Sequence, residues 1–241
     1  VIAAGGVAVA KHGNRAASSK CGAADVLEEL GININISPEK SREILSKINI
    51  CFLFAQNYHI AMKYVAPVRK ELGIRTVFNI LGPLSNPAGA NIELMGVYDE
   101  SLIEPLAKVM QNLGVKRGMV VYGTDKIDEI SMSSETKVCE ILDKENLKSY
   151  TISPKDFGYD FYDKKELEGG DRKENAEIIR NIFSLKDKGA KRKAVCMNAG
   201  AGFYIAKKVK NIKEGVQMAE NLIDEKKAFE KLEDFIKESN S

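Results

Sequence analysis

The beginning of the chain reads as a strand, a polar connection and a helix. Val7–Ala10 is an apolar run after a Gly-Gly pair, which predicts a strand buried on both faces of a parallel sheet. Ala23, Val26, Leu27 and Leu30 then recur at the spacing of one helix face, and Gly31 is a typical helix stop. This order favours an α/β fold, in which ligands bind at the carboxyl ends of parallel strands.

The same alternation resumes at about Thr76. It predicts strands at Ile92–Tyr98 and Gly118–Tyr122, a helix at Ser101–Leu113, and more antiparallel strands at Lys137–Leu142 and Leu147–Ile152. Four helices should close the chain, at about Glu174–Leu185, Ala194–Val209, Glu214–Ile223 and Lys226–Ile236. Two earlier helices, Ser37–Ile48 and Ile60–Leu72, form a helical excursion, and Pro67 predicts a kink in the second. We expect a mostly parallel sheet.

Bulk composition excludes several classes of protein. The 36 Lys and Arg residues nearly balance the 34 Asp and Glu residues, so no basic field supports nucleic-acid binding. The longest weakly polar run, Ala194–Ala206, is too short to cross a bilayer. The cysteines are too widely spaced for a zinc site or a disulfide framework, which favours the cytoplasm: Cys21, Cys51, Cys139 and Cys196. The chain opens with VIAAGG and no methionine, so we expect an N-terminally incomplete chain.

The connection Lys11–Ser19 is rich in hydrogen-bond donors. Lysine and arginine bring positive charge, Gly13 allows close backbone approach, and Ser18 and Ser19 directly precede a predicted helix N-terminus. These features favour a phosphate-type anion. The alternative is an ordinary polar turn with a satisfied histidine; composition alone does not separate the two, but the position after a strand favours function.

Two adjacent carboxylates, Asp128 and Glu129, follow the predicted strand Gly118–Tyr122. Such a pair suits Mg²⁺, which takes one or two protein carboxylates together with substrate phosphates. A solvated surface pair is the commoner explanation for such residues in general. The metal interpretation becomes the better one beside a phosphate-type loop, because a pyrophosphate needs a counter-ion.

Three further motifs have weaker signals. Arg69, with His59 upstream, could bind a substrate carboxylate, although an exposed helical arginine explains the local sequence better. Asn79–Pro87 contains two prolines and a glycine, which predicts a rigid loop. Asn198–Gly202 looks like a glycine-rich phosphate loop, but it lies in a helical pattern, so close helix packing is the better interpretation.

Several of these segments together resemble one enzyme family. They occur in the family's order over essentially the whole chain: VAKHGNRAASSKCGAADVLEELG, RTVFNILGPLSNPA, the IDE of TDKIDEIS, LEGGDRKENAEII and NAGAGFYIA. The chain resembles the anthranilate phosphoribosyltransferases. KHGNR also has looser relatives among the pyrimidine nucleoside phosphorylases, whereas RTVFNILGPLSNP is much more specific to the anthranilate enzymes.

The resemblance implies a nucleoside phosphorylase/phosphoribosyltransferase-type fold, with an active site in the cleft between two domains. Residues 1–36 and 74–241 would form the large α/β domain, and residues 37–73 part of a small α-helical domain. The implied reaction belongs to tryptophan biosynthesis: the amino group of anthranilate displaces pyrophosphate from phosphoribosyl pyrophosphate (PRPP), with Mg²⁺ as cofactor. A cytoplasmic homodimer is implied as well, with no nucleic-acid or membrane partner.

The family's site residues carry over to matching positions of this sequence. Asp128 and Glu129 match the Mg²⁺ ligands, and Arg69 the residue that holds the anthranilate carboxylate. Asn14, His59, Gly82 and Pro83 match positions along the anthranilate path. The implied PRPP-binding residues are Lys11, His12, Gly13, Asn14, Arg15, Ala16, Ala17, Ser18, Ser19 and Ala23.

The sequence also departs from the family pattern. Ala23 replaces a serine that can contact PRPP, which leaves at most a backbone contact, and Lys126 stands where a glycine is usual. The family's glycine-rich pyrophosphate loop and its metal-ligating serine segment do not occur from Val1 onward, nor do the first helices of the small domain; we expect them upstream.

Two other functions remain as alternatives. A pyrimidine nucleoside phosphorylase-like enzyme would share the fold, but LGPLSNP and Arg69 argue against it. A non-catalytic, phosphoribosyltransferase-like nucleic-acid-binding protein would need a basic surface and would lack the acidic pair, and this chain has neither property.

Overall fold

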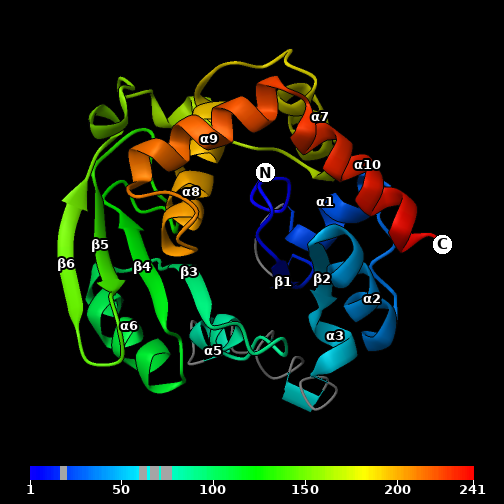
Figure 1. The fold of residues 1–241 in the computed structure, drawn as a ribbon, viewed down its shortest axis with the longest axis horizontal. Coiled ribbons are helices and arrows are strands. Elements are labelled where there is room, and N and C mark those ends of the chain that lie inside the picture. Colours follow the sequence, from blue (N-terminus) through cyan, green and yellow to red (C-terminus); the bar gives the residue numbers. More distant parts are fainter. Residues whose placement is uncertain (17–20, 60–63, 66–70, 72–77) are drawn as a thin grey trace. The chain divides into compact units, whose positions relative to one another are not determined.

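The computed structural model describes residues 1–16, 21–59, 64–65, 71 and 78–241, whose elements are labelled in Figure 1. The chain divides into two compact units. The first unit comprises Val1–Val7, Ala90–Gly169 and Ile179–Phe229, and the second comprises Ala8–Gly89, Gly170–Ile178 and Glu230–Ser241.

A four-stranded sheet forms the centre of the first unit. Its strands lie in the order β3-β4-β5-β6. The β3–β4 pair is parallel, whereas the β4–β5 and β5–β6 pairs are antiparallel. The bounds are Ile92–Gly96 for β3, Arg117–Gly123 for β4, Thr136–Ile141 for β5 and Leu147–Ile152 for β6.

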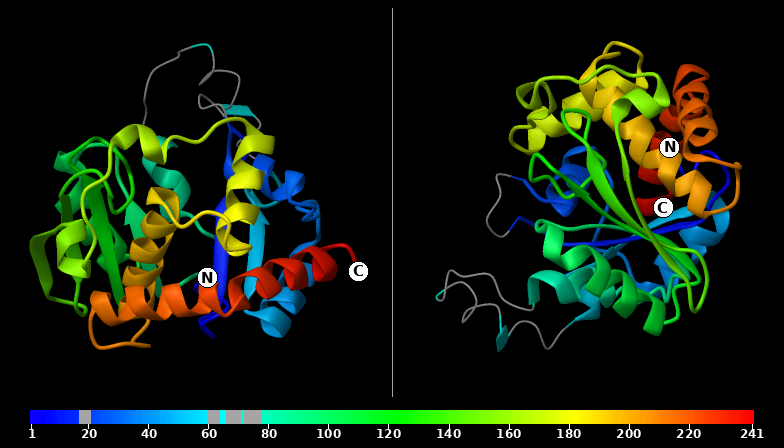
Figure 2. Two further views of the ribbon diagram at one scale, coloured as in Figure 1. Left: turned by 90° about the horizontal axis from the view of Figure 1, so that it is seen from above. Right: turned by 90° about the vertical axis from the view of Figure 1, so that its left-hand side faces the viewer.

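Helices cover both faces of this sheet, as the edge-on view in Figure 2 shows. A Cβ on Gly118 would contact Met110 of α6 (Ile103–Asn112), whereas the Arg117 guanidinium lies over the ring of Tyr204 in α8 (Ala190–Ile205), 5.1 Å from its centroid. Neighbouring residues of a strand point to opposite faces, so α6 and α8 lie on opposite sides of β4. Strand β4 is consequently buried nearly throughout.

The helix α8 packs backbone to backbone against α9 (Ile212–Asp224). A Cβ on Gly200 would lie 2.7 Å from the Val216 amide nitrogen, and one on Gly215 would lie 2.3 Å from the Gly200 carbonyl oxygen. Both positions therefore need glycine. The glycine-rich segment Asn198–Gly202 is part of α8, which confirms helix packing as its explanation.

In the second unit, β1 (Val9–Gly13) pairs in parallel with β2 (Ile50–Phe54). The helix α2 (Pro38–Ile48) begins after Ser37, whose hydroxyl accepts a hydrogen bond from the Lys40 amide at 3.1 Å. The other helices that lie wholly in this unit are α1 (Ala23–Glu29), α3 (Ala55–Tyr58) and α5 (Phe78–Leu84).

Short 3₁₀ helices and two longer helices complete the described chain. The 3₁₀ helices are η1 (Glu100–Leu102), η2 (Pro154–Phe157) and η3 (Lys164–Leu167). Helices α7 (Arg172–Phe183) and α10 (Lys227–Ser239) each include residues assigned to both units.

The α/β class and most predicted elements are confirmed, but several elements differ from the prediction. Strand β2 was not predicted, so the segment 37–73 is not made of helices alone. Strand β1 spans Val9–Gly13, so Lys11, His12 and Gly13 of the predicted connection belong to the strand. It is only half-buried, since among the described strands it pairs with β2 alone. Helix α8 begins at Ala190, before the predicted Ala194. Two of the four described strand pairings are parallel, fewer than a mostly parallel sheet requires. The helix predicted at Ile60–Leu72 lies largely outside the described residues.

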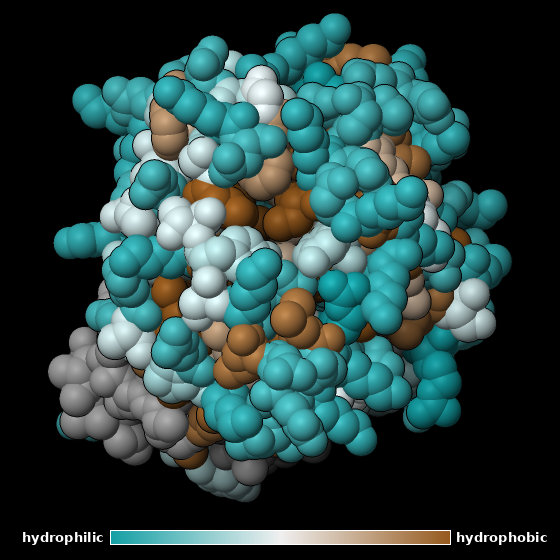
Figure 3. Space-filling view, turned by 60° about the vertical axis from the view of Figure 1, so that its left-hand side comes forward, coloured by the Kyte–Doolittle hydropathy of each residue, from teal (hydrophilic) through white to brown (hydrophobic). Residues whose placement is uncertain are grey.

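The face shown in Figure 3 is mainly hydrophilic, and its apolar side chains form small separate groups. Among the described residues, no helix combines the length and the apolar character that crossing a membrane requires.

Candidate active site

The connection after β1 doubles back tightly before α1. The Asp25 carboxylate accepts hydrogen bonds from the amides of Ala16 at 3.0 Å and Gly22 at 2.9 Å. A Cβ on Gly22 would lie 2.4 Å from the Ala16 nitrogen, so this crossing requires glycine. The two backbone donors hold the pKa of Asp25 below its usual value. Asp25 thus holds the backbone at Ala16 and at Gly22, the described residues on either side of residues 17–20.

Arg15 attaches the same connection to α1. Its guanidinium bonds to Glu28 at 2.8 Å and to Asp25 at 3.2 Å, and it lies 5.5 Å from the centroid of the Phe54 ring. The hydrogen bond to Glu28 is the main cause of its raised pKa. The charge of Arg15 is therefore already engaged by carboxylates of α1, which gives the side chain an anchoring role.

The two histidines of the chain meet in the second unit. The Nε2 atoms of His12, in β1, and His59, after α3, lie 3.1 Å apart, and the rings meet edge to face. Burial is the main cause of a lowered pKa at His12, and the charge of His59 adds to it. His12 is therefore predominantly neutral at pH 7.

Asn14 and Asn86 connect β1 to segments later in the chain. The Asn14 side-chain oxygen accepts hydrogen bonds from the Arg15 amide at 2.8 Å and from Gln56 Nε2 at 3.4 Å. The Asn86 amide group donates to the Ala10 carbonyl at 3.0 Å, which ties the LGPLSNP segment to β1.

The rigid loop predicted at Asn79–Pro87 is wrong for its first part. Gly82 and Pro83 lie in α5. Pro83 has no N–H to donate to the carbonyl four residues earlier, which is consistent with the helix ending at the next residue, Leu84. Only the residues from Ser85 onward form a loop.

The remaining predicted site residues of the second unit are either described without a polar contact to report or lie outside the described residues. Lys11 and Ala23 are exposed, and Gly13 packs against the Phe52 ring, which a Cβ would meet at 2.9 Å. Ala17, Ser18, Ser19 and Arg69 lie outside the described residues.

In the first unit, the acidic pair lies on the turn that follows β4. The turn closes through a hydrogen bond of 3.0 Å from the Gly123 amide to the Ile127 carbonyl, and Lys126 adopts a left-handed φ of 68°. A Cβ on Gly96, at the end of β3, would lie 1.4 Å from the Asp128 carbonyl oxygen. The ends of the neighbouring parallel strands β3 and β4 therefore define where Asp128 and Glu129 lie.

Asp125 anchors the start of this turn. Its carboxylate accepts hydrogen bonds from the hydroxyls of Ser131 at 3.0 Å, Ser134 at 2.9 Å, and Ser133. Burial by itself would raise the pKa of Asp125, but the serine hydroxyls together lower it. The carboxylate consequently remains charged and is used within the turn.

The electrostatics of Asp128 and Glu129 suit a cation. Both residues are exposed, yet the mass of protein around the Glu129 carboxyl, followed by the negative charge of Asp128, raises the pKa of Glu129 to about 7. A divalent cation would relieve this repulsion. No group of three or more His, Cys, Asp or Glu side chains suited to a metal occurs among the described residues. Two carboxylates without a closed cage fit Mg²⁺, which retains waters and substrate oxygens as ligands.

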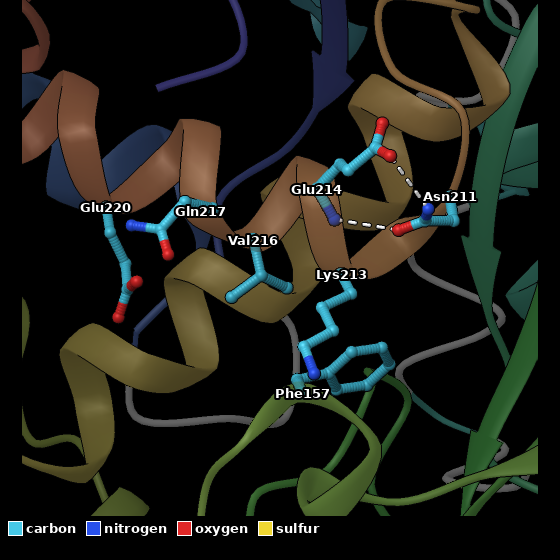
Figure 4. A pocket seen from close by; sticks show the side chains of 7 residues that line it. All are labelled: Phe157, Asn211, Lys213, Glu214, Val216, Gln217 and Glu220. Atoms are coloured by element: carbon cyan, nitrogen blue, oxygen red, sulfur yellow. Dashed lines mark hydrogen bonds between the residues drawn. The ribbon is translucent and has the colours of Figure 1, made fainter.

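A pocket of about 380 Å³ in the first unit lies apart from these residues. None of the predicted site residues lines it. Asn211 and Glu214, joined by two hydrogen bonds in Figure 4, cap the start of α9, and Glu220 accepts a hydrogen bond from the Tyr159 hydroxyl. Asn211, Glu214 and Glu220 thus have structural uses. Its lining consists of Phe157, Asn211, Lys213, Glu214, Val216, Gln217 and Glu220.

Comparisons with known proteins show the family to which the chain belongs. A family described as "Glycosyl transferase family, a/b domain" matches residues 1–229. Anthranilate phosphoribosyltransferase of Methanobrevibacter smithii is 58% identical over 241 residues, which cover 100% of this chain and 71% of the relative. The chain belongs to the anthranilate phosphoribosyltransferase family.

Solved structures of anthranilate phosphoribosyltransferases show the same fold. The Thermus thermophilus enzyme superposes with a TM-score of 0.94 at 42% identity, covering 100% of this chain and 71% of that one. The Saccharomyces cerevisiae enzyme in complex with PRPP and Mg gives 0.90 at 30% identity, with 99% and 68% covered, and that enzyme has also been solved with 4-fluoroanthranilate. This chain spans about 70% of the length of these relatives.

The sequence did not indicate several residues that shape this phosphoribosyltransferase chain. Gly22, Asp25 and Gly96 act through the backbone of the connections, and Gln56 and Asn86 act across chain segments. The one local signal was a carboxylate at the third position of α1, typical of helix capping. The other contacts depend on which strands become neighbours.

Proposed function

We propose that this protein transfers the phosphoribosyl group of PRPP to the amino group of anthranilate, with Mg²⁺ bound through Asp128 and Glu129. The observation that carries this assignment is the acidic pair on the turn after β4, where burial of the Glu129 carboxyl and, after it, the negative charge of Asp128 raise the pKa of Glu129 to about 7. Membership of the family and the PRPP and Mg bound to the yeast relative support it.

The connection after β1 would bind phosphate oxygens of PRPP. Lys11, within β1, supplies an exposed positive charge, and the backbone amides of the connection, with Ser18 and Ser19, supply hydrogen-bond donors. Asp25 and Gly22 hold the described part of this connection in shape before substrate arrives, so little ordering is needed on binding. Arg15 contributes by anchoring, unless an incoming phosphate displaces Glu28.

The Asp128 and Glu129 carboxylates would hold the metal and orient it toward the pyrophosphate group. When bound, Mg²⁺ neutralises negative charge that develops on the leaving pyrophosphate. The turn after β4 keeps both carboxylates in fixed positions, because Asp125 and Gly96 constrain its backbone. Preorganised charge of this kind is often the largest contribution to catalysis.

Anthranilate would be bound by Asn14, His59, Arg69, Gly82 and Pro83. Arg69 offers a planar pair of donors for the substrate carboxylate. Asn14 is held by Gln56, and His59 by His12, so both side chains have defined orientations. The aromatic amine is already a neutral nucleophile at pH 7, and we assign no general base. Bond formation from nitrogen to C1 of the ribose accompanies departure of pyrophosphate with the bonding electrons, and the nitrogen then releases one proton to water.

Removal of the carboxylate charges tests the metal assignment. The double variant Asp128→Asn, Glu129→Gln should lose Mg²⁺-dependent formation of phosphoribosylanthranilate by at least about 100-fold. The control Glu233→Gln, Asp234→Asn makes the same charge change in α10 and should retain activity. Near-normal rates in the first variant would contradict the proposal.

Arg69→Ala tests the anthranilate assignment. The KM for anthranilate should rise much more than the KM for PRPP, because the lost donors would bind only the carboxylate. An equal effect on both constants would remove this role from Arg69.

We also propose a homodimer that works in the cytoplasm. The family resemblance supports both statements. The proposal concerns the full-length protein, whose sedimentation equilibrium at micromolar concentration should give twice the mass of one full-length chain; a monomer would contradict the assignment.

A further inference from the structure

Asn198, in the middle of α8, binds the backbone of the residue that directly follows the acidic pair. Its side-chain oxygen accepts a hydrogen bond from the Ile130 amide at 3.0 Å. Its side-chain nitrogen donates to the Ile130 carbonyl at 3.1 Å and to the Ala194 carbonyl, one helical turn earlier, at 2.9 Å. One amide side chain thus holds both polar groups of a single backbone residue and is itself oriented by its own helix.

Only an amide side chain satisfies all three partners here. An aspartate keeps the acceptor for the Ile130 N–H but places a second oxygen against two carbonyls, and a leucine leaves every partner unpaired. Ile130 is buried, with 2% of its surface exposed, so water does not readily replace these hydrogen bonds. The contact is therefore specific to asparagine.

The helix that carries Asn198 is itself held rigidly. Helix α8 contacts α9 through Gly200 and Gly215 with no room for a Cβ, so Asn198 is carried on a backbone that cannot shift easily. The segment that it holds is fixed at two other points: Asp125 binds the serine hydroxyls, and the Asp128 carbonyl presses against Gly96. Asn198 is the constraint on the carboxyl-terminal side of Glu129.

We propose that Asn198 is a positioning residue that sets the orientation of Asp128 and Glu129 for Mg²⁺. The inference rests on the proposed function, because it takes these two carboxylates as the metal ligands. Asn198 does not contact the metal in this account; it fixes the backbone on which Glu129 is mounted. Partners of this kind commonly change metal affinity 10- to 100-fold when removed.

The test compares Mg²⁺ binding in two Asn198 variants by calorimetry in the presence of PRPP, and by the rise in Tm that Mg²⁺ produces. Asn198→Leu should raise the Mg²⁺ dissociation constant at least about tenfold. Asn198→Asp should also weaken binding, although it adds a negative charge near the site. Charge attraction alone predicts tighter binding for this variant, so the sign of its effect separates positioning from electrostatics.

Asn175 offers a matched control. Its side chain makes the same two-sided contact with the Gly170 backbone, at 2.9 Å to the amide and 3.0 Å to the carbonyl. Asn175→Leu should lower the Tm without changing the Mg²⁺ dissociation constant.

The outcomes separate this inference from the proposed function. Unchanged Mg²⁺ affinity in a folded Asn198 variant, with affinity lost in Asp128→Asn, overturns the positioning role and leaves the metal site intact. Unchanged affinity in Asp128→Asn and Glu129→Gln overturns the proposed function itself. If Asn198→Leu does not fold, the Mg²⁺ dissociation constant is measured in Asn198→Gln, which keeps both polar groups on a longer side chain. A raised constant supports the positioning role, and an unchanged constant overturns it.

Discussion

Replacement of Gly96 by alanine should impair Mg²⁺-dependent activity, although Gly96 is not one of the proposed metal ligands. The new Cβ would lie 1.4 Å from the Asp128 carbonyl oxygen and 2.4 Å from its carbonyl carbon, whereas Cβ contacts below 3.0 Å essentially do not occur. The Asp128 backbone, or the end of β3, must therefore move by about 1.6 Å. A misplacement of about 1 Å at a catalytic centre can reduce the rate about 100-fold.

The assay for Gly96→Ala measures initial rates over a range of Mg²⁺ concentrations, together with the free energy of unfolding in urea. We expect kcat to fall about 100-fold and the apparent Mg²⁺ constant to rise. Overpacking of this kind should also cost about 1–3 kcal/mol of stability.

Gly118→Ala is the control for this prediction. Its Cβ would lie 2.5 Å from the Glu93 carbonyl oxygen, so it overpacks the same pair of strands without touching the acidic turn. It should lose similar stability but keep the Mg²⁺ constant. Equal Mg²⁺ constants in both variants and the unmodified protein would refute the reasoning.

Three further substitutions test the two connections. Lys126→Gly should stabilise the protein by about 0.5–1 kcal/mol in urea unfolding, because it removes a left-handed lysine while adding chain entropy to the unfolded state; a loss of stability would contradict this strain. Asp125→Asn should cost about 2 kcal/mol at pH 7. Because the native pKa of Asp125 is lowered, the stabilisation by its carboxylate is complete above the unfolded pKa of about 4 and disappears as the pH falls through the native pKa. The unmodified protein and Asp125→Asn should therefore converge in stability at low pH. A difference in stability that does not change with pH would exclude the ionic contribution. Gly22→Ala should raise the KM for PRPP at least about tenfold, because its Cβ would lie 2.4 Å from the Ala16 nitrogen, and an unchanged KM would show that the connection does not bind PRPP.

Local patterns were sufficient for elements with clear ends. The predicted helix Ser37–Ile48 matches α2, which Ser37 caps, and the predicted helix Ser101–Leu113 ends just before the left-handed Gly114, close to the end of α6. The pair Asp128 and Glu129 could be singled out because it follows a buried strand. Lys126, noted as a departure from the family's glycine, occupies the left-handed conformation that explains why glycine is usual there.

The features that were missed depend on long-range pairing. Ile50–Phe54 is a short, continuous apolar run, and the spacing of its apolar residues does not tell a strand from a helix. Its pairing with β1 makes it a strand. The start of α8 was obscured by Lys191, Arg192 and Lys193, which carry no apolar period. Gly96 and Asn198 matter only because β3 and α8 approach the turn after β4, and no local pattern encodes that approach.

The central claim is tested most directly by incubating the purified protein with PRPP, anthranilate and Mg²⁺ and measuring pyrophosphate release together with phosphoribosylanthranilate. The account predicts equimolar formation of both products, abolished by removal of Mg²⁺ and by the Asp128→Asn, Glu129→Gln variant. Product formation that is indifferent to Mg²⁺, or phosphorolysis of a pyrimidine nucleoside in place of this reaction, would contradict it.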